Sequence, residues 1–115
     1  MNVTLYYLDG CPSYQPALEN AQTALRLERW PVDIDTVEVA SAEDAERLRF
    51  IGSPTIRIDG VDVEGPDAET RGYAFACRVY TEADDTVGWP SVASIRVALR
   101  RRPRGRPGLT AGSTS

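Results

Sequence analysis

Two cysteines carry most of the chemistry that this sequence allows, because the residues that usually activate other nucleophiles are missing. The chain of 115 residues contains no histidine, and all 13 of its basic residues are arginine. The lack of histidine excludes Ser-His-Asp and Cys-His arrangements, and the lack of lysine excludes Schiff-base chemistry. Cysteine is the side chain that reacts as a nucleophile without a base beside it. Cys11 and Cys77 are therefore the candidate catalytic residues.

Cys11 lies where a predicted strand passes into a predicted helix. Residues 3–8 form an apolar run typical of a strand covered on both faces. Apolar residues at spacings of three and four predict a helix over 12–29, and Pro12 suits a first helical position. We therefore expect Cys11 at or beside the N-cap, where backbone N–H groups and the helix dipole favour a thiolate.

The remaining periodicity predicts a mixed α/β domain. Further strands are expected at 33–39, 55–59 and 73–80, with a brief return at 61–63, and helices at 41–52 and 90–101. The first strand–helix–strand unit should be parallel, and the Asp59-Gly60 turn predicts antiparallel strands after it. The prediction is a mixed four-stranded sheet with helices on both faces, formed by residues 1–102. Residues 103–115 are expected to be a disordered tail rich in Arg, Pro, Gly and Ser.

The charge distribution limits the expected partners. All 17 acidic residues precede residue 100, whereas the last residues carry arginine and no acid. An acidic body repels nucleic acid, so we do not expect a nucleic-acid partner, although the tail either keeps the chain soluble or contacts an anionic partner. No apolar run approaches the length of a membrane span, and the first residues lack the basic start of a signal peptide. We expect a cytoplasmic protein with no membrane contact.

The element order and two short motifs resemble the thioredoxin superfamily. The motifs are Cys11-Pro12 at the first strand–helix turn and Gly52-Ser53-Pro54-Thr55-Ile56 before the third strand, and the Ile58-Asp59-Gly60 turn is most similar to the glutaredoxin-like branch. The resemblance covers about residues 2–101 and implies a thioredoxin-like fold. It also implies a thiol–disulfide oxidoreductase or thiol-transfer protein that uses Cys11 as nucleophile and needs no cofactor or metal. The implied partner is a disulfide-bearing protein or a low-molecular-weight thiol.

The same resemblance suggests which residues hold the substrate. It implies that Pro54 is a cis-proline facing Cys11, and that Ser53 offers its backbone to an extended thiol substrate. Pro12 and Tyr14 complete the predicted substrate-binding set. Tyr14 stands where dithiol members carry their second cysteine, so its ring either packs on the buried side of the helix or aims its hydroxyl at the thiolate.

Cys77 leaves two interpretations open. It is either a core residue, on a strand face shared with Tyr73, Phe75 and Val79, or the resolving thiol that forms a disulfide with Cys11.

Two alternatives to the enzyme follow from the same residues. One is a non-catalytic thioredoxin-fold binding module, and the other is a protein that binds mercury or copper through two thiolates, which select soft ions.

Overall fold

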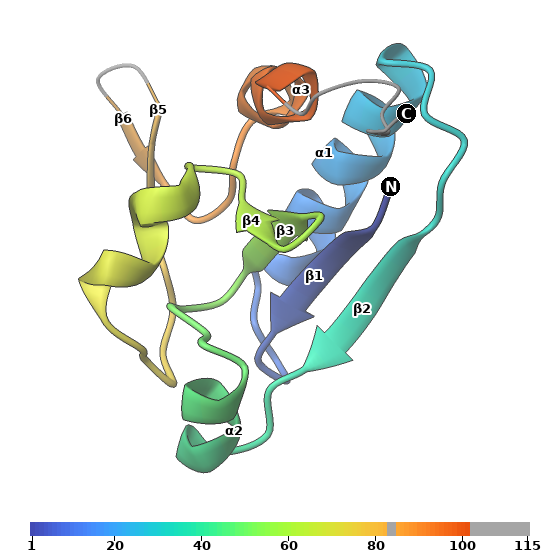
Figure 1. The fold of residues 1–115 in the computed structure, drawn as a ribbon. Coiled ribbons are helices and arrows are strands. Elements are labelled where there is room, and N and C mark those ends of the chain that lie inside the picture. The colour runs from blue at the N-terminus through green and yellow to red at the C-terminus, as the bar shows by residue number, and fades with distance from the viewer. Residues whose placement is uncertain (83–84, 102–115) are drawn as a thin grey trace.

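The structure, a computed structural model, describes residues 1–82 and 85–101 (Figure 1). The predicted tail at 103–115 lies outside the described residues. In chain order the elements are β1 Val3–Tyr7, α1 Tyr14–Leu27, β2 Ile34–Glu38, α2 Ala42–Arg47, β3 Thr55–Ile58, β4 Val61–Asp62, the 3₁₀ helix η1 Pro66–Arg71, β5 Tyr80–Glu82, β6 Asp85–Val87 and α3 Val92–Arg101.

The predicted mixed four-stranded sheet is confirmed. Its strand order is β2-β1-β3-β4, in which β1 and β2 are parallel while β3 is antiparallel to both β1 and β4. The parallel pair arises from the crossover through α1, and the antiparallel pair from the tight turn at Asp59 and Gly60, both of which have positive φ angles. β5 and β6 form a separate two-stranded hairpin beside this sheet (Figure 1).

The helices cover the sheet unequally. α1 and α3 lie against each other on one face, where their buried residues pack on Leu5 and Ile56 in the main core (Figure 1). α2 contributes Ala45 to a second, smaller cluster that includes Phe50 and the half-buried Tyr6. Because neighbouring side chains of a strand point to opposite faces, Leu5 and Tyr6 assign these two clusters to the two faces of β1.

The two long helices predicted at 12–29 and 90–101 form over Tyr14–Leu27 and Val92–Arg101. The buried residues of α1 are Ala17, Ala21, Ala24 and Leu25, and those of α3 include Ile95 and Leu99. Small alanine side chains on α1 let this helix approach the sheet and α3 closely. Among the described residues, no helix combines the length and the hydropathy that a membrane span requires.

The strand predicted at 73–80 is wrong for most of its length. Only Tyr80 belongs to a strand, and that strand pairs with β6 instead of joining the main sheet. The preceding residues lie beside the chain that leads into β3. The Ala74 N–H donates to the Phe50 carbonyl at 2.9 Å, and Ser53 and Cys77 form an isolated parallel bridge. The segment thus pairs with residues 50–53 through single backbone hydrogen bonds and not as a strand of the main sheet.

The orientation of that segment is also the reverse of the prediction. Tyr73, Phe75 and Val79, which were predicted to face the core, are about half exposed or more, and Val79 reaches 62%. Arg78 and Tyr80 are buried in their place. Burial alternates only over residues 78–80, while residues 75–77 are all exposed, so the predicted buried face is wrong.

Candidate functional site

Cys11 lies in the turn between β1 and α1 and is partly exposed. Its N–H donates to the Leu8 carbonyl at 3.1 Å, and its own carbonyl accepts from the Tyr14 N–H at 3.2 Å. The helix N-cap is Ser13, whose carbonyl accepts the first helical hydrogen bond, from Ala17. Cys11 therefore precedes the N-cap by two residues, and the expectation that Pro12 opens the helix is wrong because residues 11–14 form a separate turn.

Ser53 connects the Cys11 turn to the start of β3. The Ser53 Oγ accepts a hydrogen bond from the Leu8 N–H at 3.0 Å, and Leu8 in turn holds Cys11 through its carbonyl. Pro54 follows Ser53 through a cis peptide bond, as predicted. Leu8 thus links the Cys11 turn to Ser53, and the Leu8–Ser53 hydrogen bond spans 45 residues of sequence.

The backbone of Ser53 is already used within the chain. Its N–H donates to the Ala76 carbonyl at 2.8 Å, and its carbonyl accepts from the Arg78 N–H at 2.9 Å. Residues 74–78, which we call the strap, thereby occupy both groups that the sequence offered to a substrate. Ser53 and Pro54 are also fully buried, so their side chains face the protein interior and not solvent.

A buried ion-pair network, which the sequence did not predict, holds the strap in place. The Arg78 guanidinium donates to both carboxylate oxygens of Asp62, at 2.7 and 2.8 Å, and to Glu64 at 2.7 Å. It also stacks over the Tyr80 ring, with 4.3 Å between the Cζ atom and the ring centroid. Burial opposes the charge of Arg78, but the hydrogen bonds to Asp62 and Glu64 and the negative charge of Asp62 outweigh it, and the pKa of Arg78 is raised.

Two further contacts fix the strap to the segment before β3. The Tyr80 hydroxyl donates to the Pro54 carbonyl at 2.6 Å, and both groups are buried. Gly52, at φ +127°, lies so close to the strap that an added Cβ would stand 2.7 Å from the Arg78 Cβ. Glycine at this position therefore allows the close approach of the two backbones.

Cys77 lies in the strap and is exposed, so the interpretation as a core residue is wrong. Its backbone lies opposite Ser53, next to the chain that supports Cys11. The two thiols are not bonded, and the two cysteines stand apart in the structure. The fold thus places Cys77 on a segment neighbouring the Cys11 turn without joining the two sulfur atoms.

Tyr14 packs as a helix residue of the inner face. Its ring lies 4.3 Å from the Tyr7 ring, measured between centroids, and it is partly buried against the main core. Partial burial and the charges of Glu38, Tyr14 and Asp9 raise the pKa of Tyr7, which keeps that phenol neutral.

Pro12 is exposed at the turn. On the other flank of this turn, the Gly88 backbone closely approaches the Ser13 side chain.

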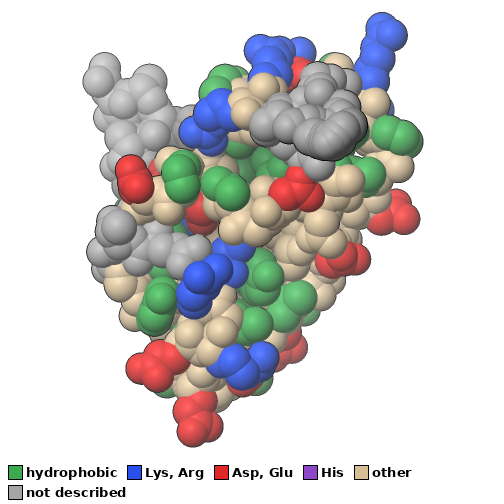
Figure 2. Space-filling view, in the orientation of Figure 1, with side chains coloured by type: hydrophobic (Ala, Val, Ile, Leu, Met, Phe, Trp, Pro, Cys, Tyr) green, Lys and Arg blue, Asp and Glu red, His purple; other side chains and the backbone are tan. Residues whose placement is uncertain are grey.

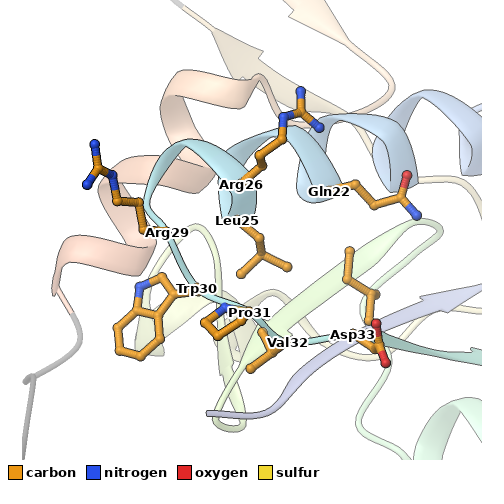
Figure 3. A pocket seen from close by; sticks show the side chains of 9 residues that line it. Gln22, Leu25, Arg26, Arg29, Trp30, Pro31, Val32 and Asp33 are labelled. Atoms are coloured by element: carbon orange, nitrogen blue, oxygen red, sulfur yellow. The ribbon is translucent and has the colours of Figure 1, made fainter.

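A groove with an apolar lining lies away from the Cys11 turn. A groove of about 450 Å³ lies where the end of α1 meets the loop to β2, with an apolar lining from Leu25, Trp30, Pro31 and Val32 (Figure 3). It is at the opposite end of α1 from Cys11. Charged and hydrophobic side chains are interspersed on the face seen in Figure 2, and that view does not single out an entrance to the site.

The residues that sequence reasoning missed are those of the buried network: Asp62, Glu64, Arg78, Tyr80 and also Thr55, whose Oγ1 accepts from Arg78 at 3.3 Å. An arginine within an alternating apolar segment was the available signal, because a buried arginine needs a carboxylate partner. The carboxylate partner of Arg78 could not be chosen among the acidic residues without the fold.

Comparisons of the chain with protein-family models, with curated proteins and with solved structures found no match.

Proposed function

We propose that this protein is a thiol–disulfide oxidoreductase or thiol-transfer protein with a thioredoxin-like fold, in which Cys11 is the nucleophile. The observation that carries the proposal is the link from Cys11 through Leu8 to Ser53, the residue before cis-Pro54. A partly exposed thiol is thereby held in a defined turn after the C-terminal end of β1, a central strand of the sheet. The mixed four-stranded sheet, in which β1 and β2 are parallel, agrees with the mixed sheet expected from the sequence and supports the proposal.

The reaction is thiol–disulfide exchange. The Cys11 thiolate attacks one sulfur of a disulfide RSSR′, a Cys11–SR bond forms, and R′S⁻ leaves and takes a proton from solvent. A second thiol then attacks the mixed disulfide, so that Cys11 leaves as thiolate and a new disulfide RSSR″ is released. The net electron flow is from the second thiol to the first disulfide.

An external low-molecular-weight thiol is the better candidate for the second step than Cys77. A disulfide requires Cα atoms within about 7 Å, and the two cysteines stand apart in the structure. Their separation also argues against a linear two-thiolate site for mercury or copper. The occupied backbone of Ser53 argues against a module that binds peptides at this edge.

The test is turnover of a small disulfide by the intact chain and by two cysteine variants. Bis(2-hydroxyethyl) disulfide is mixed with free cysteine, and the mixed disulfides are quantified over time by chromatography. The wild type and C77S should accelerate the exchange, and C11S should not. Intact-mass analysis of C77S should show one adduct, on Cys11. Full activity in C11S would overturn the proposal, and loss of activity in C77S would make Cys77 the resolving thiol.

A further inference from the structure

The strap fills the place beside Ser53 where an extended peptide could pair with the segment that leads into β3. Extended peptides bind an open backbone edge through alternating N–H and carbonyl groups. At Ser53 the N–H already bonds to Ala76 and the carbonyl to Arg78. A peptide would have to break both hydrogen bonds before it could form its own.

Opening the strap would disrupt more than two backbone bonds. Arg78 would have to leave Asp62 and Glu64, and the side chains of Arg78 and Asp62 are each 3% exposed. Removing one member of a buried ion pair leaves the other charge desolvated and without compensation. Tyr80, two residues after the strap, also holds the chain in place, because its hydroxyl donates to the Pro54 carbonyl.

The contact on the Gly52 side leaves no room for a peptide between the strap and the segment before β3. The backbone of Gly52 meets the Cα and Cβ atoms of Arg78 so closely that a Cβ on Gly52 would lie 3.2 Å and 2.7 Å from them. A peptide strand needs about 4.8 Å between backbones, the spacing already taken by the strap. The strap therefore occupies the position at Ser53 that a bound peptide strand would need.

From these contacts we infer that Cys11 is selective for small disulfides and small thiols and discriminates against extended polypeptides. The inference rests on the proposed function of Cys11 and adds its substrate class. A small disulfide needs to reach only the partly exposed sulfur of Cys11, beside the exposed Pro12. A cysteine inside a peptide brings flanking residues, and the strap denies them the backbone partners at Ser53.

The test compares two disulfides that share one leaving group. All chains carry C77S, so that Cys11 is the reacting thiol. One probe is 2-hydroxyethyl 2-pyridyl disulfide, and the other carries the same 2-pyridylthio group on the central cysteine of an uncharged heptapeptide. Release of 2-thiopyridone gives each rate constant, which is divided by the rate constant of the same probe with free cysteine.

The expected normalised rate constant is about tenfold lower for the heptapeptide than for the small probe, since about two hydrogen bonds must be given up. R78M in the same background should narrow this ratio, because it loosens the strap. R47M is the matched control: it removes an exposed arginine that pairs with Asp44, and it should leave the ratio unchanged. Equal normalised rate constants for both probes in C77S would overturn the inference.

Hydrogen exchange covers the case in which R78M does not fold. The Ser53 and Arg78 amides should be protected from exchange in C77S before any probe is added, because their hydrogen bonds close the strap. Rapid exchange at both amides in the free chain would show that the strap is already open and would overturn the inference. The proposed function fails separately, if Cys11 in the folded chain reacts with both probes no faster than Cys11 in a peptide of residues 7–15.

Discussion

Arg78 and Asp62 form a two-pronged ion pair inside the protein, with nitrogen–oxygen distances of 2.7 and 2.8 Å. The pair joins the strap to β4, across 16 residues of sequence. Both charges are removed from water, so each depends on the other for compensation. The position of the strap over Ser53 therefore rests on a charge pair as much as on backbone hydrogen bonds.

Replacing Arg78 with methionine should lower the free energy of unfolding by about 3–5 kcal/mol, because Asp62 is left buried and charged. Urea denaturation followed by circular dichroism measures this loss. The control is R47M, which removes an ion pair whose arginine side chain is 67% exposed. That variant should lose no more than about 0.5 kcal/mol. Equal losses in the two variants would show that the buried pair contributes no more than a surface pair.

Gly52→Ala should be more destabilising than Gly10→Ala. Both glycines have positive φ angles, at which alanine costs about 1–2 kcal/mol. At Gly10 an added Cβ meets nothing within 4 Å, whereas at Gly52 it collides with Arg78. The collision should add about 1–3 kcal/mol, measured as the difference between the two variants in thermal or urea unfolding. Equal effects would mean that the strap moves away at no cost.

Ser53→Ala should loosen the turn that carries Cys11. The substitution removes the Oγ that accepts from the Leu8 N–H, and the loss should be about 1 kcal/mol. Hydrogen exchange at the Leu8 amide should become faster, and the alkylation rate of Cys11 should change with it.

The control for this change is Ser41→Ala, which removes a hydrogen bond of the same kind at the N-cap of α2. It should cost about as much stability, about 1 kcal/mol, but it should leave Cys11 alkylation unchanged. A change in Cys11 alkylation of the same size in both variants would mean that the effect reflects global stability and not the turn.

Acid should weaken the contact between α1 and α3 through Glu28. Hydrogen bonds from Arg100 and Arg96 lower the pKa of Glu28 below its ordinary value of 4.5, although burial opposes this shift. A carboxylate with a lowered pKa in the folded state stabilises the fold above its unfolded pKa, and the stabilisation is lost as pH falls through the folded pKa. Urea midpoints between pH 7 and pH 3 should therefore fall less steeply in E28Q than in the wild type. Parallel curves would show that Glu28 makes no such contribution.

The local patterns were sufficient for most of the main sheet. The run at 3–8, the helical spacing after Pro12 and the Asp59-Gly60 turn each predicted an element close to its observed place. These signals are local, since they depend on hydrophobic period and turn chemistry within a few residues. The same signals misplaced the start of α1, because a turn at residues 11–14 and a first helical turn differ by hydrogen bonds that the sequence does not display.

The sequence by itself determined a mixed α/β domain with a cysteine at the first strand–helix turn and a proline before the third strand. Only the tertiary structure decided which face of residues 73–80 is buried, because alternation defines two faces and burial of Arg78 depends on Asp62 from β4. It also decided that Ser53 bonds to the strap and not to solvent. Contacts between distant segments depend on how the whole chain packs, and no local pattern contains that information.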